Sequence, residues 1–150
     1  MQNIFQLQVV DAVISRIEKL TPETKAQWGK MTVDQMLAHC NVTYELAYEN
    51  KHAKPGAFKK FMLKLFVKET VVGNKPFKKN LPTAPEFKMK ERKDFAAEKS
   101  RLINYLRKTE ELGEKYFDWK ESHSFGKLSI AEWNNMFYKH LDHHLTQFGV

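Results

Sequence analysis

The sequence contains few of the residues that define several special classes of protein. One cysteine, Cys40, cannot form an internal disulfide or supply a zinc site built from thiolates. Six glycines and five prolines are too few for a collagen-like or proline-rich chain. No apolar run approaches the roughly 18 to 20 residues of a membrane-spanning helix, and the N-terminus lacks the basic region of a signal peptide. We therefore expect a soluble, cytoplasmic protein in which His, Asp or Glu holds any metal ion.

The residues that are present are typical of a folded domain. Of the 150 residues, 42% are hydrophobic, 13% aromatic and 29% charged, a balance found in globular proteins and not in disordered chains. A chain of this length buries about two thirds of the surface that it exposes when unfolded. We expect residues 1–150 to form a single domain with one sizeable core.

Positive charge is concentrated in one part of the chain. Residues 51–93 hold thirteen of the 25 lysines and arginines but only three acids, a local net charge of +10, whereas the whole chain has +7. Most of these residues are lysines, and no nucleic-acid-binding motif accompanies them. This pattern predicts a solvated lysine surface and no binding of nucleic acid. The alternative is a surface that docks on anionic lipid or on an acidic partner.

Apolar residues recur at helical spacing in five segments, and no run alternates for long enough to form a sheet. Two capping boxes mark helix starts, Thr32 with Gln35 and Ser129 with Glu132, in which each pair satisfies free backbone donors at a helix N-terminus. The predicted helices are residues 4–20, 33–47, 57–71, 91–114 and 130–148.

The third of these helices is short and basic, and a loop follows it. Its apolar side chains lie on one side and its lysines on the other. The apolar side holds Phe58, Phe61, Met62 and Leu65, and the lysines are Lys60, Lys64 and Lys68. Three prolines make residues 73–85 a loop, and Gly113 is a plausible end for the next helix. The sequence predicts an all-α fold, a four-helix bundle with an accessory helix and a long loop between helices 2 and 3.

Two histidines of the last helix point to its apolar side. At about 100° per residue, His140 and His144 lie within the apolar stripe one turn apart, and His143 lies at its edge. Imidazoles buried without partners cost about 1 to 3 kcal/mol each. A divalent metal ion is one partner that two nitrogens at i and i+4 can share. The alternative is a pair of core histidines bonded to the backbone or to a neighbouring helix.

His39 is the candidate for a third ligand, from the second helix. It lies at the boundary of that helix's apolar stripe and either faces a neighbouring helix or is a polar flanking residue. Three histidines from two helices leave coordination positions open, as in catalytic metal sites.

Gln147 and His123 each have two interpretations, and Cys40 has a simple one. Gln147 is either a hydrogen-bond partner of the pair or an amide at the edge of the bundle. His123 either lines a pocket beside the metal or is exposed in its loop. Cys40 is predicted to be a small apolar residue of the core.

Three segments resemble a known group of proteins. Residues 28–40, 124–128 and 139–148 resemble a branch of the DinB-like superfamily that is known only as a domain of unknown function, and the likeness covers almost the whole chain. The superfamily folds as a four-helix bundle with a long connection between helices 2 and 3. Its usual metal ligands are one histidine of helix 2 and a His-x3-His pair of the last helix. Those positions match His39, His140 and His144.

The resemblance also implies a chemistry. The superfamily contains transferases and isomerases that use bacillithiol, mycothiol or glutathione. It therefore implies a divalent metal (Zn, Ni or Fe), a small thiol and an electrophilic substrate, with the metal lowering the pKa of the thiol. The alternative is a bundle that binds metal without catalysis, or an interaction module with a lysine-rich surface. The sequence is compatible with a homodimer as well as with a monomer.

Overall fold

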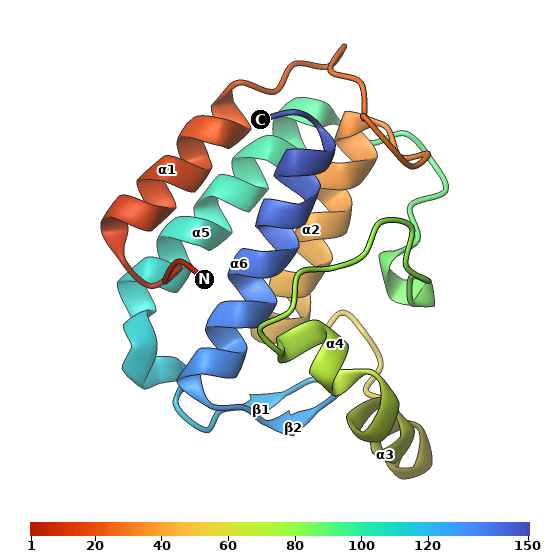
Figure 1. Ribbon diagram of the computed structural model, residues 1–150, viewed down its shortest axis with the longest axis vertical. Helices are drawn as coiled ribbons and strands as arrows, with labels where there is room; N and C mark the ends of the chain where they lie inside the picture. Colours follow the sequence, from red (N-terminus) through yellow and green to blue (C-terminus); the bar gives the residue numbers. More distant parts are fainter.

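A computed structural model describes all 150 residues, and the chain is mostly helical (Figure 1). A short 3-10 helix, η1, spans Pro85–Phe87, and an antiparallel hairpin joins β1 (Glu121–Ser122) to β2 (Gly126–Lys127). The α-helices are α1 (Leu7–Glu18), α2 (Val33–Tyr48), α3 (Ala57–Phe66), α4 (Lys68–Val72), α5 (Phe95–Phe117) and α6 (Ile130–Gln147). The predicted helical character is confirmed. The hairpin was not predicted, because strands of two residues leave no periodicity to detect.

Four long helices lie side by side, and α3 and α4 lie at one end of them (Figure 1). α2 packs against α5 and α6, and α1 packs against the same two helices. Aromatic rings pack in the core between them. The ring of Phe137 stacks on that of Tyr44 with their centroids 4.9 Å apart, and it lies tilted against that of Trp133 with their centroids 5.4 Å apart. No helix has the length and apolarity that crossing a membrane requires.

The two predicted capping boxes are present, and they fix where the site-bearing helices begin. In α2 the Thr32 N–H donates to Oε1 of Gln35 at 3.1 Å. In α6 the Ser129 N–H donates to Glu132 Oε2 at 2.8 Å, and the Glu132 N–H donates to Ser129 Oγ. These contacts satisfy backbone donors that the first turn of a helix leaves free. They set the starting register of the helices that carry the histidines.

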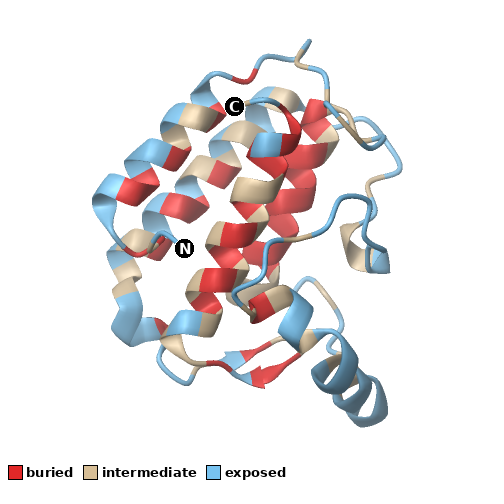
Figure 2. Cartoon of the chain, in the orientation of Figure 1, coloured by how far each residue is buried: buried red, intermediate tan, exposed pale blue.

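The segment predicted as one accessory helix is two helices. The break falls at Val67, whose φ of −113° and ψ of −34° depart from regular helix geometry. α4 packs against α6, whereas α3 has no buried residue and projects from the body (Figure 2). The apolar side of α3 therefore faces solvent, which the sequence pattern alone does not reveal.

The long helix α5 begins and ends later than predicted. Asp94 caps its start by accepting from the Ala97 N–H at 3.0 Å. Gly113 does interrupt the helix, because its φ of +67° lies in the left-handed region that glycine adopts most easily. The chain then makes one more helical turn and places Phe117 in the core. That burial explains why the helical segment continues past the glycine.

Candidate metal centre

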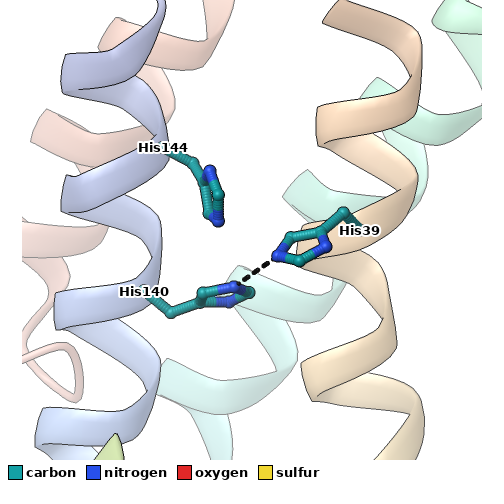
Figure 3. Close-up of side chains that lie close together, drawn as sticks. All are labelled: His39, His140 and His144. Carbon is teal, nitrogen blue, oxygen red and sulfur yellow. Dashed lines mark hydrogen bonds between the residues drawn. The ribbon is translucent and has the colours of Figure 1, made fainter. Parts of the chain in front are cut away.

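α2 and α6 bring three histidines together in the interior. His39 comes from α2, and His140 and His144 come from successive turns of α6. One ring nitrogen from each lies within 4.8 Å of the other two, and the rings converge on a common point (Figure 3). Divalent metals bind histidine nitrogens at about 2.0 to 2.1 Å, so a cluster of this size can enclose an ion. The three residues that the sequence singled out as ligands therefore meet at one place.

Two of the three rings have a fixed tautomer. His39 Nδ1 donates to the carbonyl oxygen of Phe87 at 2.9 Å, and His144 Nδ1 donates to Oε1 of Gln147 at 2.7 Å. Since both acceptors are oxygens without hydrogens, the proton of each neutral ring sits on Nδ1. The Nε2 atoms of His39 and His144 therefore carry free lone pairs, which is the state of a ligating histidine.

The third ring, His140, has two hydrogen-bonding arrangements. Its Nδ1 lies 2.9 Å from Thr43 Oγ1, and its Nε2 lies 2.9 Å from His39 Nε2. If Nδ1 donates to Thr43, all three Nε2 lone pairs face one another, and a cation relieves their repulsion. If the Thr43 hydroxyl donates instead, His140 Nε2 donates to His39 Nε2, and only the Nε2 of His144 has no hydrogen-bond partner within the chain. The hydroxyl of Thr43 thus serves either state.

Burial keeps the three imidazoles neutral. His39 and His144 are 5% and 7% exposed. Burial lowers the pKa of His39, and it lowers that of His144 to about 3. Burial, together with the neighbouring histidines, holds the pKa of His140 well below its usual value. A neutral imidazole is the form that binds metal, so the cluster is ready to ligate at neutral pH.

Gln147, the last residue of α6, joins His144 to the loop before α2. Its Nε2 donates to the carbonyl oxygen of Trp28 at 2.7 Å, which leaves Oε1 to face His144. Gly29, with φ of +83°, allows this approach, because a Cβ there would lie 2.6 Å from Gln147 Nε2. The amide is 4% exposed and has a partner on both sides. Gln147 is therefore a packed partner of His144 and not a free amide at a helix edge.

A cavity of about 230 Å³ lies beside the cluster. His143 lines it, with its ring 5.0 Å from that of His144 and 5.7 Å from that of Phe77. Its nitrogens form no hydrogen bond within the chain, and burial lowers its pKa. The other lining residues are Trp28, Pro76, Phe77, Lys79, Lys139, Asp142 and Thr146. The ammonium group of Lys139 donates to the carbonyl oxygens of Thr70 and Gly73. The cavity thus offers aromatic walls, the ammonium group of Lys79 and a neutral imidazole next to the cluster.

His123 and Cys40 lie away from this cavity. His123 is in the turn between β1 and β2, where it contacts Ser124 Oγ and the carbonyl oxygen of His52. It lines a second cavity, of about 350 Å³, and does not bond to the three histidines. Cys40 is buried in the core, as predicted, and burial raises the pKa of its thiol. A buried thiol held in its protonated form is a poor nucleophile.

Sequence reasoning missed two partners of the cluster and understated the burial of His39. Thr43 stands four residues after His39 on the same helix, and that spacing could have identified it. Phe87 accepts through its backbone oxygen, an atom that every residue carries, and its ring also lies edge-on to those of His39 and His140, with centroids 5.2 Å and 5.9 Å away. η1 covers this side of α2, and His39 is consequently buried where a boundary position was expected.

Comparison with known proteins gives one match. The model of a family described as a protein of unknown function (DUF1569) matches residues 2–149. No curated protein and no solved structure matches the chain.

Proposed function

The chain belongs to the DUF1569 family, and we propose that it binds one divalent metal ion through the Nε2 atoms of His39, His140 and His144. The observation that carries this proposal is the convergence of the three rings while each Nδ1 has an oxygen partner of its own. Such outer partners orient metal-ligating histidines and fix their tautomers.

The donor set is consistent with Zn, Ni or Fe. Three imidazoles suit these borderline ions better than Mg or Ca, which prefer oxygen ligands. Three protein ligands also leave at least one coordination position open, which is typical of catalytic sites and not of structural ones. In this proposal the chain is a DinB-like four-helix bundle of α1, α2, α5 and α6, and the cluster lies between its second and last helices.

We further propose that the site transfers a small thiol, such as bacillithiol or glutathione, to an electrophile. A bound divalent ion supplies Lewis acidity that lowers the pKa of a thiol. His143 accepts the proton that the thiol loses, because its ring is neutral, lies at the edge of the cluster and has no partner within the chain. The sulfur then bonds to the electrophilic carbon, and the leaving group departs with its electron pair. Lys79, which lines the cavity and has no carboxylate partner, favours an anionic substrate.

The competing function is a histidine cluster that does no catalysis, with or without metal. The distance of 2.9 Å between the Nε2 atoms of His39 and His140 also suits a direct hydrogen bond. Metal content and turnover separate the possibilities, because the proposed metal site requires bound metal and the proposed transferase requires turnover as well.

The first experiment measures metal in protein purified without an affinity tag. We expect about one divalent ion per chain, and a loss of most of it in His39→Ala, His140→Ala and His144→Ala. His143→Ala is the matched control, because this residue adjoins the cluster in sequence but aims into the cavity, and it should keep its metal. Equal retention by His140→Ala and His143→Ala would refute the site.

The second experiment measures conjugation of glutathione or bacillithiol to a chlorinated fluorogenic electrophile by the metal-loaded protein. We expect His143→Gln to retain metal and to lose turnover, mainly at the pH values where the wild-type imidazole is neutral. Metal without any turnover by the wild type would leave the metal site standing and reject the transferase.

A further inference from the structure

The helix α3 has an unpartnered apolar face at one end of the molecule. None of its ten residues is buried, and it projects from the body (Figures 1 and 2). Five large apolar side chains are exposed by between 37% and 78%. They are Phe58, Phe61, Met62, Leu65 and Phe66. At about 100° per residue they occupy a single arc of about 140°. The arc is too wide and too continuous to be a set of scattered surface residues.

The opposite side of α3 is attached to the body. Lys60 forms an ion pair with Glu121 of β1 at 2.5 Å, and Leu63 packs against the core. Lys59, at the edge of the arc, reaches Glu86 at 3.4 Å. These contacts set the rotation of the helix about its axis. The apolar arc therefore points away from the protein and has no place in the core.

Positive charge lies next to the arc. Residues 54–68 contain five lysines and no acid. Lys54 and Lys64 have no carboxylate partner, and neither has Lys127 of β2. Lys64 lies against the hairpin, since its Nζ is 3.5 Å from the point where a Cβ on Gly126 would be. The ion pairs of α3 thus leave a net positive surface next to the apolar arc.

We propose that α3 lies on the surface of an anionic lipid bilayer, with the arc of Phe61 and Leu65 in the outer acyl region and the lysines at the headgroup phosphates. A bilayer interface satisfies both features at once, because anionic headgroups lie directly above apolar chains. A second copy of the chain fits less well, since a symmetric contact through α3 would bring its lysines together. An acidic protein would satisfy the lysines without requiring three exposed phenylalanines.

The binding should be weak, reversible and salt-dependent. A helix of ten residues buries few side chains, and each lysine near an anionic surface changes the partition by about fivefold. Added salt screens this attraction within a distance of about 10 Å at 0.1 M. This inference does not depend on the metal site, which lies elsewhere in the fold.

The test is co-sedimentation of the full chain with vesicles of phosphatidylcholine, with and without phosphatidylglycerol. We expect binding only to the vesicles that contain phosphatidylglycerol, and its loss in Phe61→Gln/Leu65→Gln. Leu7→Gln, which removes an exposed apolar residue from α1, should bind as the wild type does. In Phe61→Trp the new fluorescence should shift to the blue on these vesicles, which reports entry into an apolar layer.

Charge is tested with two matched pairs of lysines. Lys54→Gln/Lys64→Gln should weaken binding by about fivefold for each lysine. Lys25→Gln/Lys30→Gln removes the same charge from the exposed loop between α1 and α2 and should have little effect. Equal loss in both pairs, or no binding of the wild type, would overturn the proposal. So would equal binding to polyglutamate, or a dimer in solution that Leu65→Gln dissociates.

Discussion

α2 and α3 are both helices with apolar and polar residues, but their surroundings are opposite (Figure 2). Every residue of α2 from Val33 to Glu45 except Gln35 is buried, including charged and polar ones, whereas no residue of α3 is. Asp34 can stay inside because the fold gives one of its carboxylate oxygens a partner, the Lys93 N–H at 2.6 Å. Burial in this fold therefore follows from the number of neighbouring elements and not from the side chain alone.

Truncating one phenylalanine in the core and one on α3 tests this difference in burial most directly. Phe137 is fully buried on α6 and stacks on Tyr44 of α2. Phe137→Ala should lower the free energy of unfolding by about 3 to 5 kcal/mol. Phe61→Ala on α3, where the ring is 60% exposed, should change it by less than about 0.5 kcal/mol. Urea unfolding measures both, and equal losses would mean that α3 is packed in solution.

Metal binding should stabilise the buried region. Zn²⁺ at about a hundred times its dissociation constant should raise the free energy of unfolding by about 2.7 kcal/mol. The increase should vanish in His140→Ala and remain in Phe61→Gln. Thermal unfolding with the ion and with a chelator measures it. A shift of Tm in His140→Ala as large as in the wild type would place the ion elsewhere.

Gln147 should act on the site only through His144. Gln147→Ala removes the acceptor of His144 Nδ1 and should weaken metal affinity by about 10- to 100-fold, which corresponds to about 1.4 to 2.8 kcal/mol. Gln147→Glu keeps an acceptor oxygen and should recover part of the affinity. Competition with a chelator of known affinity provides the measurement. Identical affinities of Gln147→Ala and the wild type would show that the bond does not position the ring.

Acid should destabilise the metal-free protein through the buried histidines. Burial lowers the folded-state pKa of His39, His140 and His144. Below the unfolded-state pKa of about 6.5, the unfolded chain therefore binds protons that the folded chain does not bind, which favours unfolding. Each histidine then costs up to about 1.4 kcal/mol per pH unit, and for His144 this loss continues down to its folded pKa of about 3. Unfolding free energies at neutral pH and at pH values below 6.5 measure the slope. His140→Gln should reduce it by one such contribution, and an unchanged slope would contradict the burial of a neutral ring.

Local signals in the sequence predicted the helices better than they predicted the surroundings of those helices. The capping pairs Thr32–Gln35 and Ser129–Glu132 gave the starts of α2 and α6 because they act within one turn. The helical wheel placed His140 and His144 on one inward side for the same reason. The break at Val67 and the exposure of Phe58 depend instead on what packs against the segment, and no local pattern carries that information.

The hydrogen-bond partners of the histidines also differ in how far they lie from the histidines in sequence. Thr43 lies one turn from His39, within reach of a spacing argument. The contact of Gln147 with Trp28 joins residues that are far apart in sequence, and it needs the left-handed turn at Gly29. The carbonyl oxygen of Phe87 comes from the long loop and is independent of side-chain type. The candidate ligands were thus accessible to sequence reasoning, whereas most of what orients them was not.

Because His39 donates to the backbone oxygen of Phe87, mutations at the positions that partner the histidines differ in their effect on the site. Every amino acid supplies the same backbone oxygen, so codon changes at position 87 can alter the aromatic ring without deleting the acceptor. A change of one base at position 43 or 147, by contrast, can abolish the partner of a ring. A substitution at position 87 would remove the edge-on contacts of its ring with His39 and His140 but keep the acceptor, whereas a deletion that shortens the loop would withdraw the oxygen from His39.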